Sequence, residues 1–192
     1  SDEFTTVQGI SQNTVFPIFQ EFDKGTPLLE RTNREWGRLG AARFHAQDII
    51  DRVPNIVFSQ DSNRRKCLFV GYFYLALVQH HYAAFWGISP RKGGGVLLGG
   101  PFIPSPQMHD TAVMNFTRAL EYARTDYERR LVNSFLARIH LLEGRYNECL
   151  SAAQLGLREG DTPMSLLYPS QSQNIWYDNA GVNHQIIPAA RF

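Results

Sequence analysis

The feature that most constrains this chain is the stretch from residue 67 to residue 89, CLFVGYFYLALVQHHYAAFWGIS, which contains no Asp, Glu, Lys or Arg. A membrane-spanning helix needs about 20 mostly apolar residues. Here Gln79, His80 and His81 interrupt the stretch, so the dense apolar run ends at Val78. The pattern therefore favours a helix that is buried on most of its surface inside a helical domain, and a membrane span is the alternative.

Composition excludes several classes of protein. With 192 residues and 21.9 kDa, the chain is long enough for one domain with a sizeable core. Hydrophobic residues make up 43% and aromatic residues 12%, which excludes a disordered chain, a collagen-like chain and a disulfide scaffold. Lys and Arg (19) nearly balance Asp and Glu (18), so no global field attracts nucleic acid or an anionic membrane.

Apolar spacing predicts a mainly α fold, because no alternation of strands and helices is present. The expected helices span residues 33–53, 63–86, 110–123, 129–142 and 146–157. Asn33 and Asp110 are the predicted N-caps of the first and third helices. Pro54, Gly87 and Gly160 follow the first, second and last helices, where a terminator is expected.

The flanks of the helices differ in character from the helices themselves. Residues 1–32 form an irregular lead-in that contains an apolar strap, VFPIFQEF, and residues 161–192 form an irregular tail. Between them, residues 33–160 are expected to form one helical domain with a loop insertion at 87–109. The uncharged segment 93–109 is rich in Gly and Pro, which predicts a packed or functional loop and no helix.

The segment 129–157 has the pattern of a tetratricopeptide repeat, which is a pair of antiparallel helices with small residues at their contacts. The dipeptide 136–137 (Leu-Ala) stands where the consensus has Leu-Gly, and Gly144 is expected to make the turn between the helices. The consensus slots for Ala, Phe and Ala in the second helix fall on Cys149, Ala153 and Gly156.

A second repeat is indicated upstream. Ala112, Phe116 and Ala119 reproduce the Ala, Phe, Ala spacing of a second repeat helix, and the first helix of that repeat would be 63–86. The long loop 87–109 would then split the repeat. A further opening of a first helix, W-x-x-L-G, starts at Trp36, although the sequence does not identify the partner of that helix.

These pieces occur in an order that resembles the SusD/RagB family of Bacteroidota-type outer-membrane lipoproteins. A long apolar helix (GYFYLALVQHHYAAFWG) precedes a Gly/Pro-rich loop, then a helix (DTAVMNFTRALEYA) and a closing pair (VNSFLARIHLLEGRYNECLSAAQLGL). The later NIWYDN is similar to the family's segment after the last repeat. The resemblance covers residues 33–180. Family members are usually more than twice this length, so the sequence corresponds to a fragment, a reduced relative or a different tetratricopeptide protein.

The resemblance implies a non-catalytic binding protein without a cofactor. It would be lipid-anchored at the cell surface in the outer membrane, with leader and anchoring cysteine outside this chain. There it would hold oligosaccharide or peptide nutrients for a TonB-dependent, SusC-like barrel. The alternative, which rests on the repeats and on the apolar lead-in and tail, is a tetratricopeptide scaffold for protein–protein interaction or self-association.

Two groups of aromatic residues are the candidate ligand sites. Tyr82 and Trp86 end the long apolar helix beside the Gly/Pro-rich loop, where they form either an aromatic platform or core under the loop. The second group mixes aromatic and polar side chains in an irregular segment, which suits sugar binding or a surface strap. It consists of Trp176, Tyr177, Asp178 and Asn179.

Other chemistry is not indicated. Cys67 and Cys149 are expected to be packed thiols, and a single bridge between them is the alternative. His80 and His81 are helix neighbours whose side chains point about 100° apart, so no shared metal ion is predicted. The run GGGVLLGG lacks the Lys-Ser/Thr of a phosphate-binding loop, and no catalytic constellation can be assigned from spacing. We therefore expect no enzyme activity.

Overall fold

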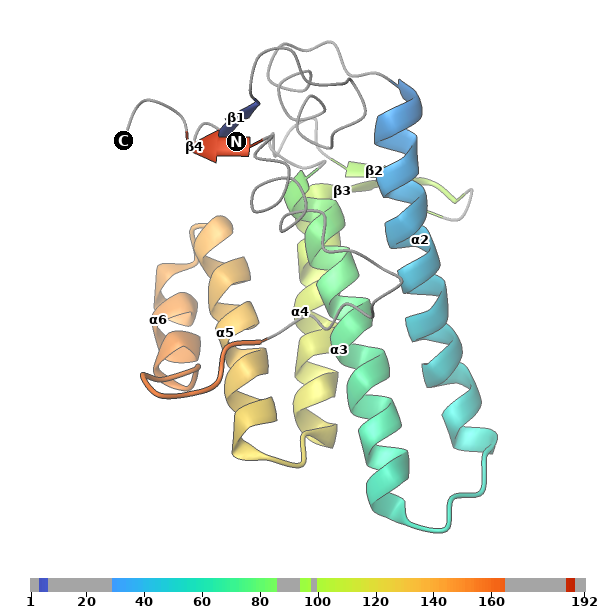
Figure 1. The fold of residues 1–192 in the computed structure, drawn as a ribbon. Coiled ribbons are helices and arrows are strands. Elements are labelled where there is room, and N and C mark those ends of the chain that lie inside the picture. Colours follow the sequence, from blue (N-terminus) through green and yellow to red (C-terminus); the bar gives the residue numbers. More distant parts are fainter. Residues whose placement is uncertain (1–3, 7–28, 86–93, 98–99, 165–185, 189–192) are drawn as a thin grey trace. The chain divides into compact units, whose positions relative to one another are not determined.

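A computed structural model describes residues 4–6, 29–85, 94–97, 100–164 and 186–188. The chain divides into two compact units, residues 1–35 with 164–192 and residues 36–163, and we call the second the helical unit. The described residues are mainly helical, which confirms the predicted fold class (Figure 1). The helices are α2 (Leu29–Arg52), α3 (Asp61–Phe85), α4 (Ser105–Tyr122), α5 (Asp126–Leu142) and α6 (Tyr146–Gln154), with a short 3-10 helix at Val53–Asn55.

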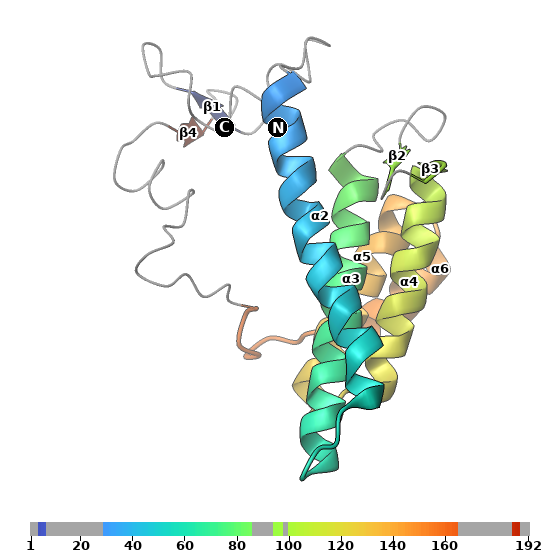
Figure 2. The same cartoon turned by 90° about the vertical axis from the view of Figure 1, so that its right-hand side faces the viewer.

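Among the described residues, each unit also has an antiparallel pair of short strands. In the first unit, β1 (Phe4–Thr6) pairs with β4 (Ile186–Pro188), so the predicted lead-in and tail each contribute one strand. In the helical unit, β2 (Gly94–Val96) pairs with β3 (Phe102–Pro104), with Gly95 opposite Ile103. This second pair lies beside the start of α4 (Figure 2).

The long apolar helix α3 is buried, as its sequence predicts. Ala76 has no exposed surface and Phe73 is 2% exposed. Phe73 meets Phe116 of α4 and Phe135 of α5, with ring centroids 5.6 Å away in each case, and Phe116 stacks on Phe135 at 5.5 Å. We call these three rings the aromatic layer. None of the described helices is both long enough and apolar enough to cross a membrane.

Helix α2 packs on α3 through small residues. A Cβ added at Gly71 would lie 2.9 Å from Ile50 Cγ1 and 3.3 Å from the carbonyl oxygen of Ala46, so only glycine allows this approach. Nearer the other end of α3, the Trp36 and Tyr82 ring centroids are 4.3 Å apart. The helix α2, which carries the W-x-x-L-G pattern from Trp36, therefore has α3 as its partner.

Helix α4 begins at Ser105, five residues before the predicted N-cap, and this corrects two predictions. Asp110 lies inside the helix and is exposed, and the last part of the Gly/Pro-rich segment is helical. Pro104 is the N-cap residue and Pro106 lies in the first turn, where a missing N–H costs nothing. The Ser105 hydroxyl donates to the carbonyl of Ala83 at 2.7 Å, which ties the start of α4 to α3.

Two other predicted helix ends also move. Helix α2 begins at Leu29, so Asn33 lies within the helix and is not its N-cap. Helix α6 ends at Gln154, so Gly160 is not its terminator, although Gly160 does have a positive φ of 87°. Pro54 is correctly placed, because α2 gives way to the 3-10 helix just before it.

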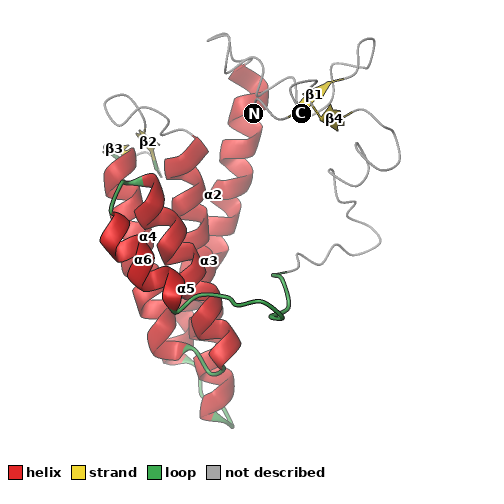
Figure 3. Ribbon diagram, turned by 90° about the vertical axis from the view of Figure 1, so that its left-hand side faces the viewer, coloured by secondary structure: helices red, strands yellow, loops and turns green. Residues whose placement is uncertain are grey.

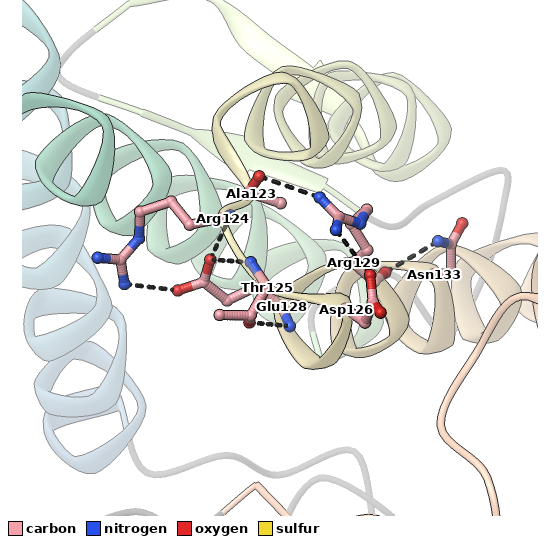
Figure 4. A network of polar contacts seen from close by, with 7 residues as sticks. All are labelled: Ala123, Arg124, Thr125, Asp126, Glu128, Arg129 and Asn133. Carbon is pink, nitrogen blue, oxygen red and sulfur yellow. Dashed lines mark hydrogen bonds and ion pairs between the residues drawn. The ribbon is translucent and has the colours of Figure 1, made fainter. Parts of the chain in front are cut away.

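Helix α5 begins at Asp126, earlier than predicted, and a capping box starts it (Figure 4). The Thr125 hydroxyl accepts from the Glu128 N–H at 3.1 Å, and the Glu128 carboxylate accepts from the Thr125 N–H at 3.3 Å. Arg124 adds an ion pair to Glu128 at 2.8 Å. These bonds satisfy the N–H groups that the first turn of a helix leaves free.

The α5–α6 hairpin follows the predicted repeat with one change of register (Figure 3). Gly144 makes the turn with φ of 71°, as expected of a glycine. Helix α6 packs through Ala152, and just beyond its end a Cβ at Gly156 would lie 2.8 Å from Ser134 Oγ. Ala153, predicted to fill the Phe slot, is exposed. Cys67 and Cys149 are both free and half-buried, so no bridge joins them.

Candidate functional site

The predicted aromatic platform at the end of α3 is a packed cluster. Tyr82 is 1% exposed, and its hydroxyl donates to the carbonyl oxygen of Trp36 at 2.9 Å. Val78, Ala83 and Met108 surround its ring. This burial agrees with the packing alternative for Tyr82, because the ring has no exposed face on which a ligand could stack.

The other predicted ligand residues lie outside the described part of the chain. These are Trp86, Trp176, Tyr177, Asp178 and Asn179. Their role in binding stays a prediction.

The segment that contains the β2–β3 pair packs against the cluster around Tyr82. Leu97 and Ile103 pack against it, and a Cβ at Gly95 would collide with the Trp36 ring. Glycine at position 95 therefore allows the strand backbone to lie on the indole. In its described residues around β2 and β3, the Gly/Pro-rich segment therefore packs against the helices and is not an open loop.

Phe102 is an exposed aromatic residue that the sequence analysis missed. It lies on β3 with 56% of its surface exposed, and its neighbour Ile103 faces the cluster. Exposed and half-buried side chains alternate along β3, as they do in a strand with one packed face. The sequence PFIP is compatible with this alternation, and that was the signal from which the exposure of Phe102 could have been predicted. Phe102 thus offers an accessible ring close to the place where Tyr82 was expected to offer one.

A second group of titratable side chains lies on the three helices α3, α4 and α5. His80 of α3 is 2% exposed and His109 of α4 is 7% exposed, and their rings stack with centroids 5.5 Å apart. His140 of α5 is half-buried. We call these three residues the histidine layer. Beside it, the Asn115 amide donates to the Gln79 side chain at 2.8 Å.

The histidine layer is incompletely hydrogen-bonded. His80 Nδ1, His109 Nε2 and His140 Nδ1 are buried and have no hydrogen-bond partner within the described ranges. His109 Nδ1 lies 3.6 Å from a Glu143 carboxylate oxygen. Glu143 is itself paired with Arg145. Buried polar atoms without a partner are uncommon, because each costs the loss of its hydration.

Burial sets the protonation state of the layer. Burial, together with the neighbouring His81, His109 and Arg138, lowers the pKa of His80 to about 3, and burial is the largest of these causes. Burial also lowers the pKa of His109 and of His140, although Glu143 opposes the shift at both. All three rings are therefore neutral at pH 7.

No metal site is found among the described histidines. Within the described ranges, no group of three or more His, Cys, Asp or Glu side chains is arranged to hold a metal ion. His81 instead directs its Nδ1 to the carbonyl of Leu77 at 2.7 Å, away from a shared ligand position with His80.

The outer face of the α5–α6 hairpin is apolar and uncovered in the described structure. Large side chains there are between 55% and 70% exposed, and the group consists of Leu141, Leu142, Tyr146, Leu150 and Leu155. We call it the hairpin face. An apolar group of this kind on a repeat helix is typical of a surface that binds another helix.

Comparison with other proteins adds no relative. No protein-family model matches the chain, and the comparisons with curated proteins and with solved structures gave no match.

Proposed function

We propose that the protein is a non-catalytic surface binding protein of the SusD-like type, which holds a glycan or peptide nutrient for a TonB-dependent outer-membrane barrel. The observation that carries the proposal is the order of the helices. The pair α3–α4 is interrupted by the connection 86–104 and is followed directly by the hairpin α5–α6. That order is what the resemblance to the SusD/RagB family requires.

The proposed ligand contact is aromatic. A ring face binds the C–H groups of a sugar or an apolar peptide side chain, and nearby polar groups give the orientation. Phe102 supplies such a face on β3, and the strand that carries it is held in place by Ile103 packing on the cluster below. Trp86 and the segment 176–179 are the further proposed contacts.

A binding screen with oligosaccharides and short peptides tests this function. We expect a bound ligand by calorimetry, and Phe102→Ala should weaken it about tenfold, since stacking on one aromatic ring contributes about 1 kcal/mol or more. Phe44→Ala, which removes an equally exposed ring from α2, is the matched control and should leave affinity unchanged. A ligand that binds both variants equally would remove Phe102 from the site, and a screen without any ligand would count against the function.

The hairpin face favours a second function, a tetratricopeptide scaffold that binds a partner protein or a second copy. Leu150 lies on α6 and is 61% exposed. Light scattering after size-exclusion chromatography should then show an assembly that Leu150→Glu dissolves. Val57→Glu changes an exposed side chain outside the hairpin and is the control. A monomer at all concentrations would leave self-association without support.

A further inference from the structure

We propose that the histidine layer is an acid-sensitive switch, which loosens the packing of α4 and α5 on α3 when its rings take up protons. The proposal concerns the packing of the helical unit and is independent of the proposed ligand or barrel. It rests first on position. The His80 and His109 rings stack between α3 and α4, two of the helices that also share the aromatic layer, so a change in their charge acts where these helices meet. His140 lies on α5, the third helix of that layer.

Among the described residues, the groups around His80 offer its protonated form no ion-pair partner. On its own helix its neighbours are Gln79 and His81, and the ring of His81 lies 5.6 Å away. From α4 it faces His109, and from α5 the cation of Arg138 acts on it. Within the described ranges no carboxylate forms an ion pair with His80. A proton on this ring would therefore be a buried charge among like charges.

His109 and His140 both lie near carboxylates, and Glu143 and Arg145 act on both rings. His109 lies near Glu143, and Asp110 of α4 and Arg145 act on it with opposite signs. His140 is influenced by Glu143 and by Glu148 of α6, and again by Arg145. Arg145 pairs with Glu143 and lies 3.7 Å from Asp110, so its single positive charge offsets part of the negative charge of these two carboxylates. His80 is therefore the ring of the layer whose protonation is least compensated.

The direction of the pH dependence follows from the sign of the shift. An unfolded histidine takes up its proton near pH 6.5, whereas folded His80 takes it up only near pH 3. The stability that depends on neutral His80 is complete above pH 6.5 and falls as the pH drops from 6.5 toward 3. Between pH 7 and pH 5 this one ring should lower the folding equilibrium constant about 20–30-fold.

Two measurements on the intact chain test the switch. In an NMR titration of the histidine rings, His80 should keep the chemical shift of a neutral ring down to pH 5. His45, which is exposed on α2, supplies the matched variant for the unfolding experiment. In acid unfolding followed by near-ultraviolet circular dichroism, His80→Phe should move the midpoint to lower pH. His45→Phe should leave the midpoint where it is.

Each outcome bears on the proposal. An unchanged midpoint in His80→Phe, or a folded His80 ring that titrates near pH 6.5, would overturn it. Should the larger phenylalanine prevent folding, His80→Gln keeps a polar side chain that does not titrate. That variant should show the same acid resistance if the switch is real.

Discussion

The aromatic layer and the histidine layer are drawn from the same three helices, α3, α4 and α5, and have opposite chemistry. Phe73 and His80 lie two turns apart on α3, and Phe116 and His109 lie two turns apart on antiparallel α4. The aromatic rings meet edge to face or stacked, with no polar atom to satisfy. The His80 and His109 rings are equally close, but the histidine layer leaves ring nitrogens without partners within the described part of the chain. Similar packing distances therefore do not imply similar energetics, since the histidine rings can take up protons and the phenylalanine rings cannot.

Removing a ring from the aromatic layer should have the largest effect. Phe116 has no exposed surface and contacts both other rings, so Phe116→Ala should cost about 3–5 kcal/mol of unfolding free energy through lost burial and the cavity left behind. Urea unfolding monitored by circular dichroism measures the loss. Phe44→Ala on the exposed face of α2 is the control and should change stability by less than about 0.5 kcal/mol.

The second-largest effect is the pH dependence of stability, which should distinguish the histidine layer from the aromatic layer. Acidification from pH 7 to pH 5 should lower the free energy of unfolding by about 2 kcal/mol through His80. The reason is that His80 is protonated at pH 5 in the unfolded chain but stays neutral in the folded protein. Phe116→Leu should lower stability equally at both pH values, and His80→Phe should reduce the difference between them. If Phe116→Leu changed the pH dependence as strongly as His80→Phe, the two layers would not be separable.

A change outside both layers should have the smallest effect. Thr125→Ala removes the capping box of α5 and should cost about 1 kcal/mol at either pH. Thr117→Ala, which removes an exposed hydroxyl from the middle of α4, is the matched control. A loss as large as that of Phe116→Ala would mean that the cap, and not the aromatic layer, holds α5 in place.

The sequence predicted the helices better than their ends. Apolar spacing identified α3 and the contacts of Ala112, Phe116 and Ala119, because such spacing records which helix face is buried. The start of α4 was missed because Pro104 and Pro106 were read as helix breakers, whereas a first turn accepts proline. The start of α5 could have been found, since Thr125-x-x-Glu128 is a capping signature.

The candidate sites were less predictable because they depend on contacts between distant residues. Nothing near His80 in the sequence shows that His109 stacks on it, since the two are brought together only by the antiparallel pairing of α3 and α4. Tyr82 was a reasonable candidate for ligand binding by its position at a helix end. Its hydrogen bond to Trp36 comes from another helix, and that contact buries it.

The central claim is the binding role beside an outer-membrane barrel, and purification of the native protein from detergent-solubilised source membranes tests it most directly. Mass spectrometry of the purified complex should find a large TonB-dependent barrel in stoichiometric amount, and its recovery should not depend on added ligand. Recovery of the protein alone, or with soluble proteins only, would contradict the claim. The hairpin face and a scaffold function would then be the account to pursue.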